Sequence, residues 1–159
     1  MSSKPDPGTT GQRSSPSFSG CRPASGAASR TKQRNRKTGS KAELALRRAL
    51  WRLGVRYRLY CSDLPGNPDL AFFRQRIAVF VDGDFWHGRD WARRQERLHS
   101  GNNSAYWIAK IAYNRERDLR NNALLAELDW RVLRLWETDV LKDPERAAEQ
   151  VAALFVSGK

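Results

Sequence analysis

Three aspartates and a histidine stand close together in the middle of the chain, and their types suit the hydrolysis of a phosphodiester. Asp69 follows a proline-containing turn, and Asp82, Asp84 and His87 come shortly after it. Carboxylate oxygens are the ligands that Mg²⁺ prefers, and such an ion can activate water and stabilise charge on a phosphodiester. A neutral imidazole nearby can take a proton from that water as a general base. The alternative is that these acids only balance neighbouring arginines at the surface.

The segments around these acids predict a hairpin that would hold two of them together. Residues 69–73 and 76–82 are typical of two strands joined by a two-residue turn. Asp69 then faces Phe80, and Asp82 is its diagonal neighbour on the same face, about 7–8 Å away between Cα atoms. Both carboxylates would be within reach of one cation, whereas one additional turn residue would reverse the faces.

The remaining elements predict an α/β sandwich around a small mixed sheet. Ser40 and Glu43 form a capping-box pattern that starts a helix, and Asp143-Pro144 is typical of the start of the last helix. Residues 83–103 contain turn residues and aromatics without a clear period, which indicates a long loop. In chain order we expect a helix over 40–53, strands over 55–61, 69–73 and 76–82, a helix over 104–128, a strand over 130–136 and a helix over 144–155.

The composition favours a folded domain with a polyanionic partner. The chain has 159 residues, a hydrophobic fraction of 40% and a formal net charge of +12, which suits nucleic acid as the partner. It contains no run of about 18 apolar residues and no segment typical of a secretory signal. Two cysteines are too few for a disulfide scaffold or a four-cysteine zinc site. We therefore expect a cytoplasmic protein with no membrane-spanning segment.

Residues 1–39 differ from the rest of the chain in charge and composition. They hold eight basic residues and one acid, are rich in Ser, Gly, Pro and Thr, and contain a single aromatic residue, Phe18. This composition is typical of a disordered basic arm, which leaves residues 40–159 as the folded domain. The arm could be a tether that raises nonspecific affinity for DNA, or a tail with little effect.

Six segments, taken together, resemble the very-short-patch-repair (Vsr) endonucleases, which are DNA mismatch nickases. The resemblance implies the PD-(D/E)xK architecture, a restriction-endonuclease-like three-layer α/β/α fold with a small mixed central sheet. It also implies Mg²⁺-dependent nicking of one strand of duplex DNA. The segments stand in family order and are AELALRRALW (42–51), RYRL (56–59), DLPGNPDL (63–70), AVFVDGDFWHG (78–88), YWIAKIAYNRERD (106–118) and LDWRVLRLWE (128–137).

The resemblance implies a role for each residue that matches the family's active site. Asp69 falls on the metal-binding aspartate, and Val81 falls on the residue whose backbone carbonyl is a further metal ligand. His87 falls on the histidine that activates the attacking water. Glu43 falls on a first-helix glutamate near the metal waters, and Asp118 falls on an acid that supports the active-site histidines.

Asp82 departs from the best-known members, which have a histidine at its position. We expect it to be an additional metal ligand, because the predicted hairpin places it beside Asp69. Other residues fall on the family's DNA-contacting positions or on the basic face of the long helix, for which loop packing and a solvated face are the alternatives. The expected DNA contacts are Phe85, Trp86 and Trp107 with the bases, and Lys110, Arg115 and Arg117 with the phosphates.

The positions of the family's structural zinc ligands hold other residues in this chain. They are Asp84, Arg89, Trp91 and Thr138, which lack the usual thiolates and histidine. We therefore expect no structural zinc, and we expect ordinary packing or an ion pair between Asp84 and Arg89 in its place. The same loop contributes to mismatch recognition in the family, so the T:G preference does not follow from the resemblance alone.

These observations predict a Mg²⁺-dependent endonuclease that nicks one strand of duplex DNA at or near a mismatch in very-short-patch repair. One alternative is a nuclease of the same fold with a different DNA target, such as a restriction or mobile-element enzyme. Another is a DNA-binding module without catalysis. We expect a monomer whose partners are double-stranded DNA, mismatched or paired, and proteins of a repair pathway.

Overall fold

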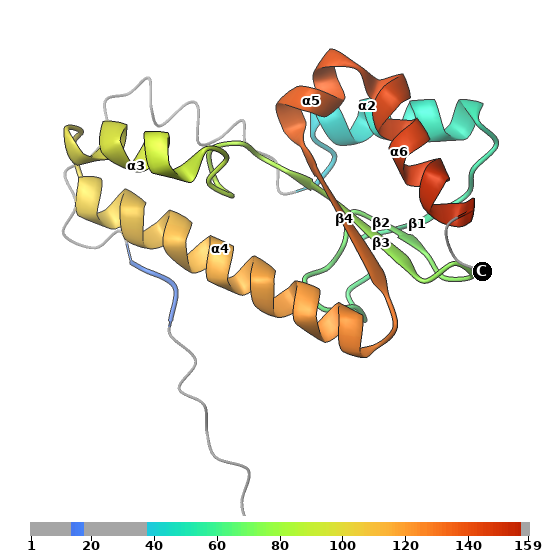
Figure 1. Ribbon diagram of the computed structural model, residues 1–159, viewed down its shortest axis with the longest axis horizontal. Helices are drawn as coiled ribbons and strands as arrows, with labels where there is room; N and C mark the ends of the chain where they lie inside the picture. The colour runs from blue at the N-terminus through green and yellow to red at the C-terminus, as the bar shows by residue number, and fades with distance from the viewer. Residues whose placement is uncertain (1–13, 18–37, 157–159) are drawn as a thin grey trace, which may run out of the picture.

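The computed structural model describes residues 14–17 and 38–156, so most of the arm predicted from the sequence lies outside the described residues. The described elements alternate between helices and strands (Figure 1). In chain order they are α2 (Lys41–Arg52), β1 (Arg58–Leu59), β2 (Leu70–Phe72), β3 (Ile77–Asp82), α3 (Trp91–His99), α4 (Ser104–Glu127), β4 (Arg131–Trp136), α5 (Glu137–Lys142) and α6 (Pro144–Val156).

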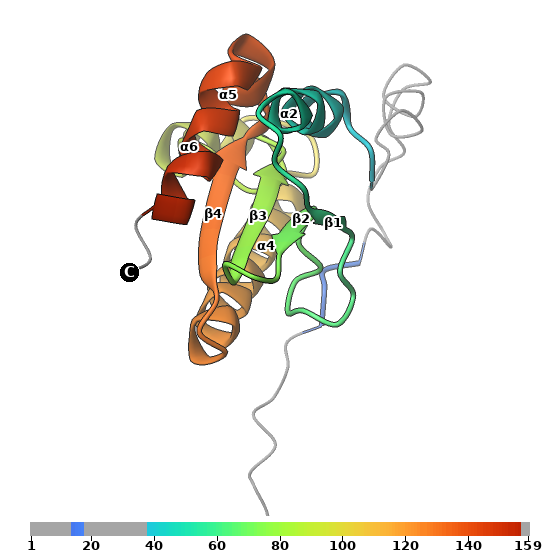
Figure 2. The same ribbon diagram turned by 90° about the vertical axis from the view of Figure 1, so that its right-hand side faces the viewer.

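The four strands form one mixed sheet in the order β1-β2-β3-β4, with the strands side by side in Figure 2. The first three strands run antiparallel, and β4 lies parallel to β3 after the crossover through α3 and α4. Leu70 pairs with Val79, and the N–H of Arg76 donates to the carbonyl of Phe73 at 3.3 Å. The turn therefore has two central residues, which confirms the predicted register and keeps Asp69 and Asp82 on one face.

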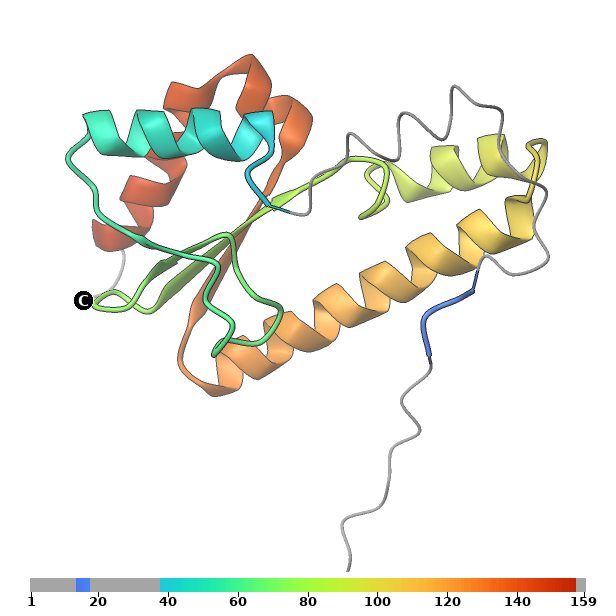
Figure 3. The ribbon, with the colours of Figure 1, turned by 180° about the vertical axis from the view of Figure 1, so that it is seen from behind.

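Helices cover both faces of the sheet, so the predicted three-layer α/β/α arrangement is confirmed. In Figures 1 and 3, α2, α5 and α6 lie on one side of the sheet and α4 lies on the other. Alternation along the strands supplies the two cores. Leu70 and Val79 are fully buried in the core with α2, α5 and α6, whereas Ala78 and Phe80 are buried with Leu125 of α4.

Two helices were not predicted from the sequence, and one predicted loop is wrong. Helix α3 occupies the middle of residues 83–103, and α5 directly follows β4. Helix α3 has two large apolar residues, Trp91 and Leu98, none of its residues is buried, and the left-handed Asp90 before it makes no side-chain cap. The sequence therefore offers few of the signals that identify a helix. Strand β1 is also shorter than the predicted 55–61.

The other predicted boundaries agree with the structure to within a few residues. Ser40 caps α2 by accepting a hydrogen bond from the N–H of Glu43 at 3.2 Å. Asp143 caps α6 in the same way, through the N–H of Arg146 at 3.0 Å. These local signals require no tertiary contact, which is why they can be recognised in the sequence. None of the helices in the described ranges is long and apolar enough to cross a membrane.

Candidate active site

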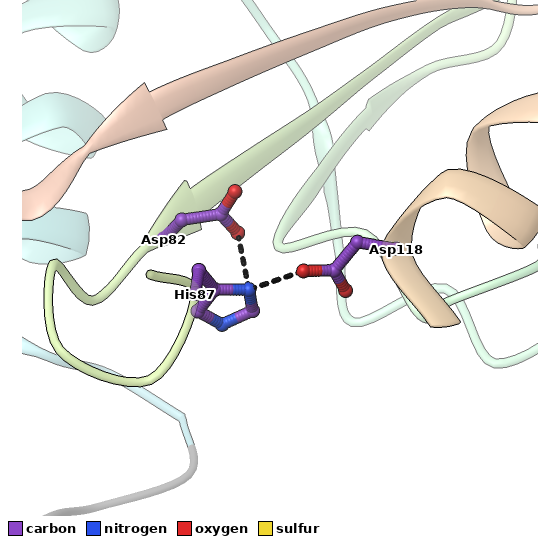
Figure 4. A group of neighbouring side chains, drawn as sticks. All are labelled: Asp82, His87 and Asp118. Atoms are coloured by element: carbon purple, nitrogen blue, oxygen red, sulfur yellow. Dashed lines mark hydrogen bonds and ion pairs between the residues drawn. The ribbon is translucent and has the colours of Figure 1, made fainter. Parts of the chain in front are cut away.

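The end of β3, the loop after it and the middle of α4 bring three predicted site residues together (Figure 4). His87 Nδ1 lies 2.5 Å from Asp118 Oδ2 and 3.5 Å from Asp82 Oδ1. We call these three residues the histidine cluster. The loop that carries His87 packs closely on α4, because a Cβ at Gly88 would lie 2.8 Å from Cγ2 of Ile111. Only glycine, which also adopts the positive φ of 67° found there, allows this approach.

Arginine side chains neutralise the two acids of the histidine cluster. Arg134 Nη1 donates to both carboxylate oxygens of Asp82, at 2.8 and 2.9 Å, and Arg134 Nη2 lies 3.7 Å from Asp118 Oδ1. Arg117 Nη2 lies 3.3 Å from the same oxygen of Asp118. Burial acts to raise the pKa of Asp118, but the hydrogen bond to His87 and the charges of the two arginines bring it below its usual value.

Arg134 was not identified from the sequence, although the sequence contains a signal for it. It is the one charged residue between Val132 and Trp136 of β4, where an alternating strand otherwise carries apolar side chains. In the parallel register Arg134 stands beside Phe80, and its guanidinium lies 4.2 Å from that ring's centroid. A strand arginine among apolar residues indicates a buried carboxylate partner, but the identity of that partner depends on strand pairing.

Asp69 and Glu43, which we call the acidic pair, lie in a different electrostatic setting. The N–H of Val81 donates to Asp69 Oδ2 at 2.7 Å. Burial raises the pKa of Asp69 to about 6, and the negative charges of Glu43 and Asp82 add to this rise despite the Val81 hydrogen bond and His87. The buried Glu43 accepts from the N–H of Gly39 at 2.7 Å, whereas a capping box would turn this carboxylate to Ser40.

Tyr60 joins the two acids and was also not identified from the sequence. Its hydroxyl donates to Glu43 Oε1, and its N–H donates to the carbonyl oxygen of Asp69 at 3.3 Å. Its φ of 48° lies in the left-handed region, which is costly for an aromatic residue and is found mainly where the surroundings impose it. We found no sequence signal for this geometry.

The two groups of acids differ in how well they fit a divalent cation. The ligand atoms of the histidine cluster lie within 4.8 Å of one another, but arginines already compensate both of its carboxylates. In the acidic pair Glu43 is buried and Asp69 is partly buried, and one arginine lies near, with Arg47 Nη1 3.9 Å from Glu43 Oε1. A dication would offset the burial and the repulsion that raise the pKa of Asp69, so Asp69 is the carboxylate that gains most from binding Mg²⁺.

The structure brings the three predicted DNA-stacking aromatics into one group. Ring centroids lie 5.2 Å apart for Phe85 and Trp86, 5.5 Å for Phe85 and Trp107, and 5.8 Å for Trp86 and Trp107. All three side chains are partly exposed. Asn114 of α4 donates to the carbonyl of Trp86 at 2.9 Å, which fixes this group next to the histidine cluster.

The predicted phosphate-binding cations lie along α4, and each also has a partner within the protein. Lys110 contacts the hydroxyl of Ser15, and the guanidinium of Arg115 lies 5.6 Å from the ring centroid of Trp91. Arg117 pairs with Asp118, as described above. The structure therefore places all three on the helix that carries the site, and their contact with phosphates stays a prediction.

Three of the four positions where the family has zinc ligands form a network of polar contacts, which we call the polar clip. Asp84 Oδ1 lies 2.9 Å from Arg89 Nη1, which confirms the predicted ion pair. Asp84 Oδ2 accepts from the hydroxyl of Thr138 at 2.6 Å, and Arg89 Nη2 lies 2.9 Å from Asp139 Oδ1. Although burial acts to raise the pKa of Asp84, these hydrogen bonds lower it overall. The clip joins the His87 loop to α5.

Comparison with known proteins gives matches to DNA mismatch endonucleases and to nicking enzymes. The family model described as DNA mismatch endonuclease Vsr matches residues 25–93. The type II nicking enzyme V.NmeDIP of Neisseria meningitidis serogroup C is 44% identical over 119 residues, which cover 75% of this chain and 79% of that protein. The type II nicking enzyme V.HpaIIP of Haemophilus parainfluenzae is 42% identical over 120 residues, covering 76% and 84%. The DNA mismatch endonuclease Vsr of Escherichia coli K12 is 37% identical over 90 residues, covering 53% and 52%.

Proposed function

This chain belongs to the Vsr family of restriction-endonuclease-like DNA endonucleases, and from that premise we propose that it nicks one strand of duplex DNA at or next to a T:G mismatch, using Mg²⁺. As an endonuclease it is not the DNA-binding module without catalysis that we considered from the sequence. The observation that carries the proposal is the contrast between Asp69, which forms no ion pair with an arginine in the described part of the chain, and the histidine cluster beside it, in which arginines neutralise the acids.

Asp69, the carbonyl of Val81 and Asp82 are the residues that would hold the metal. Asp69 keeps Oδ1 available, because its hydrogen bond to the N–H of Val81 uses Oδ2. Asp82 offers the lone pairs that Arg134 leaves, since each carboxylate oxygen has two. When bound, Mg²⁺ supplies a positive charge that orients water and stabilises charge on the scissile phosphate. Glu43, anchored by Gly39 and Tyr60, would orient waters at this place.

His87 would receive the proton of the attacking water at Nε2. Its Nδ1 faces Asp118 at 2.5 Å, and an ionised carboxylate there keeps the proton on Nδ1. The other ring nitrogen, Nε2, then carries a lone pair and can accept a proton. The role of Asp118 is therefore to select the tautomer and hold the ring, as arginines keep its own carboxylate ionised.

The aromatic group beside His87 supports a mismatch as the preferred target. Phe85, Trp86 and Trp107 would stack against bases at a step that has been opened. A mismatched step unstacks at a lower free-energy cost than a paired one, so insertion of these rings favours mismatched duplex. Monomeric action and cooperation with repair proteins stay predictions from the sequence.

A second candidate function is the nicking of a fully paired target sequence. V.NmeDIP and V.HpaIIP are named type II nicking enzymes, without mention of a mismatch. In addition, the polar clip occupies the loop region that takes part in mismatch recognition in the family. The two candidates share the same chemistry and differ only in the DNA that they select.

The deciding experiment compares strand cleavage of two duplexes that differ in a single base, so that one has a T:G pair and the other a C:G pair. We expect nicking of one strand in Mg²⁺, faster on the T:G duplex, and none in excess EDTA. Asp69→Ala should lose activity, and Asp129→Ala, which changes an exposed aspartate outside the site, should keep it. Equal cleavage of both duplexes would favour the second candidate, and cleavage by Asp69→Ala would refute the mechanism.

A further inference from the structure

The outer face of α2 carries a surface hollow that the proposed mechanism does not use. Its volume is about 590 Å³. It contains three arginines and no acid among its lining residues. Trp51 is 59% exposed, and the guanidinium of Arg56 lies 3.8 Å from the centroid of its ring. The lining residues are Leu44, Arg47, Arg48, Trp51, Arg52 and Tyr57.

A second hollow, at the C-terminal end of α4, offers a comparison within the same protein. Its volume is similar, about 650 Å³, but its arginine, Arg76, pairs with Asp129 at 3.4 Å, and Glu127 also lines it. The hollow on α2 is therefore distinguished by its charge and not by its size. Arg52 pairs with Glu145 of α6 at 2.9 Å, where both side chains are exposed to solvent, and Arg47 pairs with Glu43 at 3.9 Å. Arg48 forms no ion pair within the described residues, so the hollow keeps positive charge that attracts an anion.

Arg47 connects this hollow to the acidic pair. It stands one helical turn after Glu43, and its Nη1 lies 3.9 Å from Glu43 Oε1. Arg47 Nε is buried and has no hydrogen-bond partner, the one such side-chain nitrogen or oxygen in the part of the chain that the structure describes. A buried donor without a partner is costly, and a phosphate oxygen is a strong acceptor for a guanidinium.

The direction of α2 also connects the hollow with the acidic pair. The helix begins at the end of the sheet where β3 ends and the His87 loop starts, and it runs away from that place (Figure 3). Duplex DNA that has its scissile phosphate at Asp69 continues beyond it as an evenly spaced chain of negative charges. A basic hollow that starts one turn from Glu43 is complementary to such a chain, and Trp51 offers an aromatic surface to the sugars.

We propose that the hollow on α2 binds the sugar–phosphate backbone of the DNA next to the nicked position, with Arg47 as the anchor and Arg48 as a second phosphate contact. This inference rests on the proposed function only in placing the scissile phosphate at the acidic pair. On binding, the partly exposed side chain of Arg47 turns outward, so that Nε, which is buried without a partner in the free protein, donates to a phosphate oxygen.

Equilibrium binding to duplex DNA in EDTA tests this proposal without cleavage. Binding is measured as a function of salt for the full chain and for Arg47→Met, Arg48→Ala and Arg76→Ala. Methionine preserves much of the aliphatic packing of Arg47, and Arg76 is the matched arginine of the second hollow. We expect each of the first two variants to bind roughly 10-fold more weakly and to lower the slope of log K against log salt by about 1. Arg76→Ala should match the wild type.

The outcomes separate this proposal from the proposed function. Unchanged slopes for Arg48→Ala and Arg47→Met would overturn it, even if the enzyme nicks mismatched DNA in Mg²⁺. Reduced slopes would support it, even if no mismatch preference is found. Should Arg47→Met unfold, Arg48→Ala decides, because that side chain is exposed. A duplex with a neutral methylphosphonate next to the nicked position should bind the wild type more weakly and Arg47→Met no differently.

Discussion

The acidic pair and the histidine cluster lie within one site, but they differ in how far positive charges compensate their carboxylates. In the histidine cluster, Arg134 and Arg117 compensate Asp82 and Asp118, and the pKa of Asp118 is lowered. In the acidic pair, Asp69 is partly buried, has no ion pair with an arginine of the described residues, and has its pKa raised to about 6. The carboxylates of the histidine cluster are thus compensated by arginines before any ligand binds, whereas the acidic pair keeps excess negative charge until a cation binds.

This difference indicates which function each of the two groups serves in the site. A group that must hold a proton acceptor in one orientation benefits from fixed, neutralised partners. A group that must bind a dication benefits from negative charge that the protein itself leaves unbalanced, because binding then relieves repulsion. Metal affinity is therefore obtained at some expense of the stability of the metal-free protein.

The largest effect is expected from removal of the proton acceptor. His87→Ala should lower the nicking rate by about 100- to 10,000-fold, since no other residue holds an imidazole at this place. His99→Ala is the matched control, because His99 is the second histidine of the chain and lies exposed at the end of α3. Single-turnover nicking at saturating Mg²⁺ measures both. If His87→Ala nicks at a rate close to that of His99→Ala, the histidine cluster is structural.

The next prediction tests whether Asp69 is strained. Folding raises its pKa from 3.8 to about 6, so the metal-free protein loses stability as the pH rises from about 4 to about 6. Asp69→Asn retains an acceptor for the N–H of Val81 and removes the charge. It should be more stable than the wild type by on the order of 2 kcal/mol at pH 7.5 in EDTA, with little difference below pH 4.

Denaturant unfolding at several pH values measures this difference, and saturating Mg²⁺ provides the control. The metal should stabilise the wild type and leave the stability of Asp69→Asn nearly unchanged. The difference in the free energy of unfolding between the two proteins should then become smaller or change sign. If the difference in the free energy of unfolding between the two proteins does not change with pH, the pKa of Asp69 is not raised by folding.

A smaller effect is expected from the hydroxyl that holds Glu43. Tyr60→Phe should raise the Mg²⁺ concentration for half-maximal nicking by roughly 3- to 10-fold, because one hydrogen bond to a buried carboxylate is lost. It should reduce the Mg²⁺-induced rise in Tm in parallel. Tyr57→Phe is the control, since its hydroxyl bonds to the carbonyl of Arg47 at 3.3 Å and leaves the acids untouched. Equal metal dependence in both variants would assign Tyr60 to packing alone.

The smallest effect concerns the polar clip. Asp84→Asn and Arg89→Ala should each lower Tm slightly, and the double variant should lose less than the sum, because both changes remove the same ion pair. A higher salt concentration should reduce the loss of Tm in each variant, since the ion pair is partly exposed and salt screens it. Thermal unfolding of the wild type, the two single variants and the double variant gives the four values of this double-mutant cycle. Strict additivity would mean that Asp84 and Arg89 do not interact.

The parts of the site that follow from local sequence were predicted well. The register of the hairpin rests on the length of one turn, and the starts of α2 and α6 rest on the capping residues Ser40 and Asp143. Such signals act over a few residues, so they can be identified before the fold is known. The resemblance to the family added Asp118, which no spacing argument could connect with His87 across the chain.

The partners that set the charge of the site could not be derived in this way. Arg134 reaches Asp82 because β4 pairs in parallel with β3 after a crossover, and Tyr60 reaches Glu43 because β1 ends beside the start of α2. Helix α3 was not predicted because it has few large apolar residues and no side-chain cap at its start.

The amino-acid sequence by itself determined the local geometry, the fold class and the candidate residues Asp69, Asp82 and His87. The tertiary structure alone decided which of these acids is compensated and which is left with excess negative charge. Electrostatic strain depends on distances between charges from separate elements and on their burial, and neither quantity exists until those elements have packed together.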